Sequence, residues 1–438
     1  MKTKSTKWTL VVLLLLAALL LPMVGACKGA APPGAAIPTA EKTVKVGLSL
    51  CYTGALGTHG SHYADGLRDY LAWVNKEGGI EYTDPVTRKT ERAMMDVIWE
   101  DNAYDPAKSV AIYKRFKGAG VQLIVGYGST PGEAMAPSAS RDKIPVMELY
   151  CYASPAGYEP KPQYYAAGFG NVVEAYMAIA DWFMKNWKEN RPPRLAAMAL
   201  SVPSQKTLNN PSGVPAYVQK AGGVYVGTEW FPGVVTDTTV QLKRLVTDGQ
   251  ADFLWVWGAV GHAIIVAKDL YRMGVDTNKV TVVMAACAID ESLAKAIPKE
   301  SEGIWGEDYA VTPREVDIPG VKLAMEIAKW RGKDPDTYLT KTHLEGVMQG
   351  MIVCEGLKIA LEKVGHNALT TTDIRDGFFS IKDLDVMGLS HPVTQRDPGY
   401  PCFCPWLRIS RCENGKYVPK TGFVCYQPVI PEGREIEK

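Results

Sequence analysis

The sequence lacks an excess of charge of either sign. Its 438 residues carry 48 lysines and arginines against 47 aspartates and glutamates. A protein that binds nucleic acid would need a basic patch, and a protein that binds anionic lipid directly would need a polybasic segment. Both classes are therefore disfavoured, and no nucleic-acid partner is expected.

Signatures of catalysis are also scarce. There are only six histidines, and the G-x-S-x-G nucleophile motif is absent from the sequence. The glycine-rich stretch 54–60 misses the G-x-G-x-x-G spacing of dinucleotide-binding loops and has no phosphate-loop lysine. His59 and His62 are three residues apart, but solvated histidines at the start of a helix are the simpler interpretation. We expect no enzyme activity, no cofactor and no metal.

Long apolar runs are missing except at the N-terminus. Residues 10–21 would span about 18 Å as a helix, too short for a hydrocarbon core of about 30 Å. Three lysines precede this run, and Val24-Gly25-Ala26-Cys27 follows it in a pattern that resembles the bacterial lipobox. We predict that residues 1–26 are a signal peptide and that Cys27 carries a lipid anchor. The alternative is an ordinary secretory signal whose cleavage site happens to lie near Cys27.

Residues 27–42, rich in Ala, Pro and Gly, are predicted to tether the folded part to the membrane. Nine cysteines are more typical of an exported chain than of a cytosolic one. A C-terminal group of four is expected to form one or two disulfides whose pairing stays open, since a zinc site fits the spacing poorly. This group consists of Cys402, Cys404, Cys412 and Cys425.

From residue 43 onward, short apolar runs rich in β-branched residues alternate with stretches of helical period. The runs expected to form strands are 45–51, 95–101, 121–127 and 144–150, then 194–200, 223–230, 252–257 and 280–286. Alternation with helices of 10–15 residues predicts parallel sheets built from right-handed βαβ units. The fold class expected is α/β, with two doubly wound Rossmann-like lobes joined by a hinge. We expect residues 43–165 plus 303–385 in the first lobe, and 166–302 plus 386–438 in the second.

Open parallel sheets bind ligands beyond the carboxyl ends of their strands. The residues that follow the predicted strands are therefore the candidates for ligand contact. They are Tyr127, Ser129, Thr130, Tyr150, Tyr152, Ala153, Ser154, Trp257 and Cys287.

The order of several motifs resembles a known family. The stretches VKVGLSLCYTGALGTHG, EDNAYDPAKSVAIYKRF, VQLIVGYGSTPGEAMAPSA and DFLWVWGAVGHAIIVAKDLYRMG are the main ones. Together they are similar to the type I periplasmic binding proteins of the leucine/isoleucine/valine-binding kind, over roughly residues 44–419. The resemblance implies two lobes that close on a small ligand like a hinged trap, and it implies delivery to an ABC permease with its ATPase subunits.

The segment Ser129-Thr130-Pro131-Gly132-Glu133 has two compatible interpretations. Thr130, Pro131 and Glu133 fit a capping box with proline in the first helical turn. A helix N-terminus can also hold a carboxylate, because it presents free N–H groups and a partial positive charge. The resemblance implies that this loop binds the carboxylate of the ligand.

One position departs from the family pattern. The amino-acid binders of the family place an acid after the strand that here is 280–286, and this position corresponds to Cys287. A thiol cannot replace a carboxylate as the counter-ion of a ligand ammonium, and an unpaired buried ammonium is costly. A carboxylate or amide without an amine, with aromatic groups that stack on Tyr127, Tyr152 and Trp257, therefore becomes a credible ligand. Glu148 is either a partnered buried acid or a ligand group.

We therefore expect an extracytoplasmic, monomeric, substrate-binding lipoprotein of an ABC importer. It would hold a small molecule between its lobes and attach to the membrane through Cys27. The alternative is a surface lipoprotein of the same fold that senses the ligand and signals to a membrane receptor.

Overall fold

A computed structural model describes residues 42–54, 56–151, 163–202, 205, 207–211, 213–289, 291–395 and 406–425. The predicted signal peptide, Cys27 and nearly all of the tether lie outside these residues. By its internal contacts the stretch 42–438 forms one unit. No helix in the described ranges is long and apolar enough to cross a membrane.

The first sheet has six described strands, in the order β2-β3-β1-β4-β5-β6. All neighbouring strands run parallel except β2 and β3. Their bounds are β1 (Thr43–Leu50), β2 (Ile80–Thr83), β3 (Thr90–Asp101), β4 (Leu123–Gly126), β5 (Val146–Cys151) and β6 (Tyr165–Asn171).

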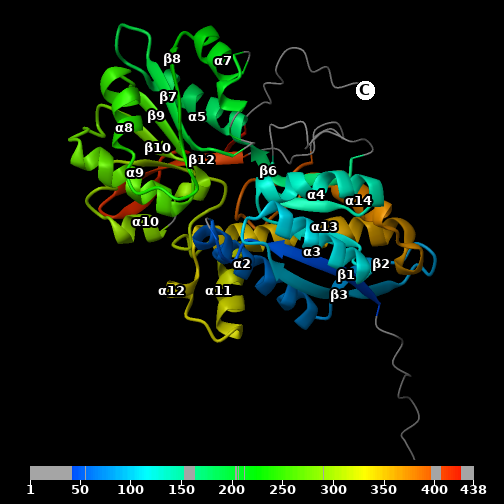
Figure 1. Cartoon of the computed structure of the whole chain (residues 1–438). Coiled ribbons are helices and arrows are strands. Elements are labelled where there is room, and N and C mark those ends of the chain that lie inside the picture. The colour runs from blue at the N-terminus through cyan, green and yellow to red at the C-terminus, as the bar shows by residue number, and fades with distance from the viewer. Residues whose placement is uncertain are drawn as a thin grey trace, which may run out of the picture. The chain divides into compact units, whose positions relative to one another are not determined.

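Helices cover both faces of this sheet (Figure 1). On one face, Val46 and Leu48 of β1 belong to the core that includes α2 (Gly57–Lys76) and α13 (Lys341–Val364). A separate core cluster on the other face includes residues of α3 (Pro106–Gly118) and α4 (Ser129–Asp142). Because side chains alternate along a strand, a strand covered on both faces is apolar throughout, and β4 is fully buried. Three further helices lie between residues 319 and 379, in addition to α13. They are α11 (Pro319–Trp330), α12 (Pro335–Tyr338) and α14 (Thr371–Phe379).

The second sheet has eight described strands, in the order β13-β12-β11-β10-β9-β7-β8, with β14 paired to β12. The strands from β8 to β11 are parallel, whereas β12 pairs antiparallel with its neighbours. The strand bounds are β7 (Arg194–Leu200), β8 (Val224–Phe231), β9 (Phe253–Trp257), β10 (Thr281–Met284), β11 (Trp305–Asp308), β12 (Trp406–Glu413), β13 (Lys416–Pro419) and β14 (Val424–Cys425). Its helices include α5 (Val172–Asn186), α7 (Val214–Lys220), α8 (Thr239–Leu242), α9 (Val260–Arg272) and α10 (Glu291–Ala296).

All strands predicted from the sequence are present, and the two-lobed α/β fold is confirmed. The lobe boundaries need correction at two strands. The prediction placed β6 in the second lobe and β11 in the first, whereas the sheets place β6 in the first and β11 in the second. Both strands lie next to chain crossovers, and neither contains a β-branched residue.

A partly buried carboxylate joins the loops at the edge of the first sheet. Asp101, at the end of β3, accepts hydrogen bonds from the backbone N–H groups of Tyr52 (2.9 Å), Thr53 (3.2 Å) and Ala103 (2.9 Å), and from the Thr53 hydroxyl. These bonds hold the pKa of Asp101 below its ordinary value despite its partial burial. Asp105 then caps α3 by accepting from the Lys108 N–H at 2.7 Å.

The C-terminal hairpin is present, but its expected disulfide is not found at Cys412. Asn414 and Gly415 have the positive φ angles of a tight turn between β12 and β13. Cys412 is a buried free thiol whose Sγ lies 3.5 Å from Ser301 Oγ, so it points into the second lobe and is not in a disulfide. Cys402, Cys404 and the side chain of Cys425 lie outside the described part, where pairing stays a prediction.

Candidate functional site

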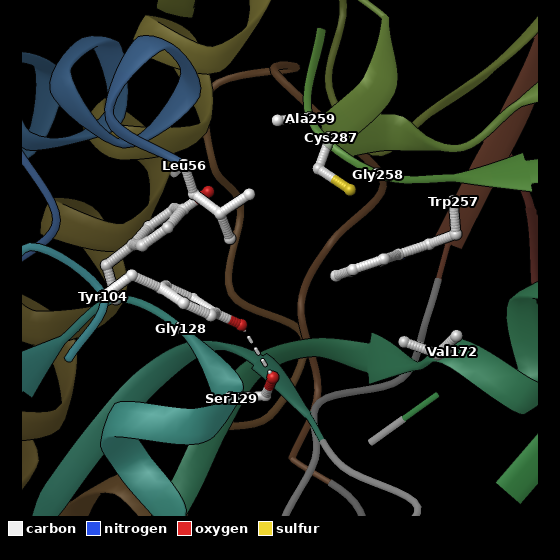
Figure 2. Close-up of a pocket in the computed structure, with 10 residues that line it drawn as sticks. Leu56, Tyr104, Gly128, Ser129, Val172, Trp257, Gly258, Ala259 and Cys287 are labelled. Carbon is white, nitrogen blue, oxygen red and sulfur yellow. Dashed lines mark hydrogen bonds between the residues drawn. The ribbon is translucent and has the colours of Figure 1, made fainter. Parts of the chain in front are cut away.

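A pocket lies where the carboxyl ends of strands from both sheets meet, and the empty space in it, including the part open to solvent, is about 400 Å³. Residues that follow β1, β3 and β4 form one wall, and residues that follow β6, β9 and β10 form the other. Figure 2 shows Leu56, Tyr104 and Ser129 facing the indole of Trp257 and the thiol of Cys287 across this space. The lining residues are Leu56, Tyr104, Tyr127, Gly128, Ser129, Val172, Trp257, Gly258, Ala259 and Cys287.

Two hydroxyl groups on the first wall are joined. The Tyr104 and Ser129 oxygens share a hydrogen bond of 2.9 Å (Figure 2). Burial raises the pKa of Tyr104 to about 12, so its hydroxyl stays protonated. Gly128 has φ +106°, and a Cβ there would overlap the Tyr104 ring. Glycine is thus what lets this ring pack against the start of α4.

The helix that follows this turn begins earlier than predicted. α4 starts at Ser129 with Gly128 at the N-cap, and within the described chain no side chain caps it. The predicted capping box of Thr130 and Glu133 is therefore wrong, because the helix already includes both residues. The first turn of α4, rather than a capped loop, presents its N–H groups at the pocket.

The first wall is backed by a buried histidine. His59 Nδ1 lies 2.7 Å from the Tyr127 hydroxyl, so this hydroxyl is engaged inside the lobe. The Tyr63 ring also packs on Tyr127, with centroids 5.4 Å apart. Burial lowers the pKa of His59 to about 3, so the imidazole is neutral. The expectation that His59 is solvated is wrong, since α2 turns it into the core.

The second wall is apolar. Trp257 and Cys287 are 9% and 5% exposed, and Val172 and Ala259 complete the surface. The turn after β9 is fixed from within its own lobe, because Ala259 N–H donates to His262 Nδ1 at 3.1 Å. Burial raises the pKa of the Cys287 thiol well above its ordinary value, so it is protonated and uncharged.

Four of the predicted site residues line the pocket, namely Tyr127, Ser129, Trp257 and Cys287. Thr130 lies beside Ser129 in α4 but is not part of the lining. The side chain of Tyr150, and Tyr152, Ala153 and Ser154, lie outside the described residues. Ligand contact at all these positions stays a prediction.

Sequence reasoning missed Leu56, Tyr104 and Val172. Tyr104 had a usable signal, because it follows β3 just as Ser129 follows β4. It sits in a loop with positive φ angles at Ala103 and Tyr104, which brings its ring back over the sheet edge. Val172 was missed together with β6, since its position depends on where that strand ends.

Glu148 is not part of the pocket lining. It is fully buried beneath the start of α4, and in the described structure neither carboxyl oxygen has a hydrogen-bond partner. Burial raises its pKa well above the ordinary value, so the group is a neutral carboxylic acid. Neither predicted role, a partnered acid or a ligand group, fits this environment.

The described lining contains no aspartate, glutamate, lysine, arginine or histidine. The described ranges also contain no group of three or more His, Cys, Asp or Glu side chains arranged to hold a metal ion. The pocket therefore offers hydroxyls, backbone N–H groups, aromatic rings and a thiol. These groups can bind a small molecule, and they lack the arrangement of a nucleophile with its base.

Two α/β lobes with a pocket at their facing strand ends define a solute-binding protein. The family model described as periplasmic binding protein matches residues 43–398, and the chain belongs to this family. The family is a non-enzymatic class that binds solutes outside the cytoplasm. No curated protein matches the sequence.

Solved structures of similar fold carry different ligands. A branched-chain amino acid ABC transporter protein from Thermus thermophilus with bound valine has a TM-score of 0.74 at 16% identity, covering 88% of this chain and 97% of its own. A fatty acid ABC transporter substrate-binding protein from Thermomonospora curvata has a TM-score of 0.71 at 19% identity, covering 90% and 95%. A solute-binding protein from Rhodopseudomonas palustris in complex with 3,4-dihydroxybenzoic acid has a TM-score of 0.67 at 18% identity, covering 88% and 98%.

Proposed function

We propose that this chain captures a small carboxylate- or amide-bearing solute without a free amine, preferably an aromatic one, and delivers it to an ABC permease. The observation that carries the proposal is the uncharged lining of the pocket, which includes Cys287 at the position where the family resemblance implies an acid. An amino acid would bury its ammonium against this lining without a counter-ion, at a cost of several kcal/mol.

The groups of the first wall suit a carboxylate. Ser129 and Tyr104 share one hydrogen bond, so the hydroxyl that does not donate to the other can donate to a carboxylate. The first turn of α4 adds N–H groups and the positive end of a helix dipole. The Trp257 indole on the opposite wall offers a flat apolar surface to the rest of the solute. A ligand that contacts both walls stabilises the closed arrangement by binding it better than the open one.

The protein is proposed to work as a monomer at the outer face of the cytoplasmic membrane, held there by a lipid on Cys27. Its partners would be the permease and its ATPase subunits. Mass spectrometry of the membrane-extracted protein tests the anchor, because a diacylglyceryl group on Cys27 adds a defined mass. A mature N-terminus without lipid would contradict it.

A solute panel read by thermal unfolding tests the ligand class. The panel would contain 4-hydroxybenzoate, benzamide, octanoate, leucine and valine. A solute at 100 times its dissociation constant should stabilise the protein by about 2.7 kcal/mol. Stabilisation by the aromatic acid and not by the amino acids is expected, whereas strong stabilisation by leucine or valine would overturn the inference from Cys287.

A further inference from the structure

A buried lysine of the first lobe reaches into the second lobe behind the pocket. Lys341 is the first residue of α13, which packs along α2, and its side chain is 2% exposed. Its Nζ donates to the carbonyl oxygens of Ala286 at 3.2 Å and Glu307 at 3.3 Å, and forms an ion pair with Asp308 at 3.1 Å. One side chain therefore joins the first lobe to two separate segments of the second.

The Ala286 contact bears directly on the pocket. Ala286 begins the short helical turn Ala286–Ala288, which carries Cys287 into the pocket lining. The backbone N–H of Lys341 also donates to Glu291 Oε2, at 3.1 Å, at the start of α10 just beyond this turn. Lys341 thus contacts the chain on both sides of Cys287.

The two turns of the second wall are held differently. His262 of the same lobe holds the turn that carries Trp257 and Ala259. The turn that carries Cys287 has a bond within its own lobe, from the Ala285 N–H to the Val256 carbonyl at 2.8 Å, and is also held from the other lobe by the Lys341 ammonium. The position of Trp257 is therefore set within its own lobe, whereas the position of Cys287 depends both on its own lobe and on α13 of the other.

The charge at this junction is balanced. Burial by itself lowers the pKa of Lys341, but the negative charges of Asp308 and Glu345 raise it above its ordinary value. The side chain is therefore a cation. Arg408 Nε lies 3.8 Å from the same Asp308 carboxylate, and Arg408 also makes two hydrogen bonds to Glu315, of 2.8 and 2.6 Å. Asp308 would therefore keep a cationic neighbour if Lys341 were replaced.

We propose that Lys341 is a positioning residue for solute binding, which holds the Cys287 turn at a fixed distance from the first wall. The role in binding rests on the proposed solute site between the two walls. The position of the Cys287 turn can be measured without any solute, so a failure of the solute assignment would leave this inference open to its own test.

The test uses the reactivity of the Cys287 thiol in the solute-free full chain. Lys341→Met keeps an unbranched side chain of nearly the same length but removes the Nζ hydrogen bond to the turn. Iodoacetamide labelling, followed by peptide mass spectrometry, gives a rate for each cysteine. We expect Cys287 in K341M to react about tenfold faster, as loss of roughly 1.4 kcal/mol of local stability would give. The rates at the buried Cys51 and Cys412 should change by less than about twofold.

Arg408→Met is the matched control, because it also removes a buried cation beside Asp308 but has no bond to Ala286. It should leave the Cys287 rate unchanged. Equal rates at Cys287 in K341M and the wild type would overturn the proposal. So would equal acceleration at Cys287 and Cys412, which indicates general destabilisation. If K341M does not fold, K341Q takes its place, with a smaller expected increase in the Cys287 rate. Failure of both variants to fold would overturn the proposal, because Lys341 would then be required for folding and would not merely position the turn.

Discussion

The two walls of the pocket differ in how they use polar side chains. The first wall presents the linked hydroxyls of Tyr104 and Ser129 at the start of a helix, whereas the second presents Trp257, Val172 and a protonated thiol. Hydrogen bonds depend strongly on direction, and apolar contact depends mainly on area. The first wall is therefore suited to orienting a solute by its carboxylate, and the second to accepting apolar groups of varied shape.

Buried titratable groups lie behind both walls. In the first lobe, burial lowers the pKa values of His59 and His343 to about 3. In the second lobe, burial raises the pKa of Glu307 to about 7, although Trp255 donates a hydrogen bond to it at 3.0 Å. Acid must therefore act on these buried histidines and on Glu307 in opposite directions.

Two opposite effects of pH on stability are expected from this difference. Below pH 6.5 an unfolded histidine gains a proton that buried His343 does not, so His343 makes the fold less stable by about 2 kcal/mol at pH 5. The pKa of Glu307 is about 7 in the folded state and about 4.5 in the unfolded state. Between these two pH values Glu307 is more protonated in the folded state, so acid favours folding by a similar amount. Urea unfolding at pH 7 and 5 measures their combined effect, in which the two contributions oppose each other.

Variants separate the two contributions. His343→Leu should reduce the loss of stability between pH 7 and 5 relative to the wild type, and Glu307→Gln should increase it. The sign is the decisive result. If both variants shifted the pH dependence in the same direction, the opposite pKa shifts assigned to His343 and Glu307 would be wrong.

Trp257→Ala tests the second wall. Removing the indole should weaken binding of the best solute by roughly 30- to 100-fold, or about 2–3 kcal/mol, because a buried tryptophan contributes large contact area. Isothermal titration calorimetry measures the affinity. Trp330→Ala is the control, since Trp330 is 40% exposed and is not part of the pocket lining. A loss of less than about threefold in W257A would mean that the apolar wall does not supply the affinity.

Ser129→Ala tests the first wall and should have a smaller effect. Loss of one hydrogen bond to a charged group is expected to weaken carboxylate binding about tenfold. The matched amide, such as benzamide for benzoate, should lose less, because a neutral group forms weaker hydrogen bonds. Tyr104→Phe removes the neighbouring hydroxyl and should cost about threefold. Equal losses for acid and amide in S129A would contradict a carboxylate site at α4.

The sequence predicted the strands well because β-branched runs and helical periods are local signals. The prediction failed where the position of a residue depends on contacts with elements distant in the sequence. Burial of His59 and the approach of Tyr104 to Gly128 arise from packing between elements far apart in the chain. The start of α4 was misjudged because a plausible capping box follows a glycine that can itself begin the helix. Cys287 was located through family resemblance, but its link to Lys341 spans more than fifty residues and has no local signature.

The hydrogen bonds to Asp101 have a consequence for affinity. They fix the loop after β1 to the loop after β3, next to Tyr104, in the protein without solute. A loop that is already ordered loses little conformational entropy when a solute arrives. The rim of the first lobe is in this sense preorganised, so more of the interaction energy remains available to hold the solute.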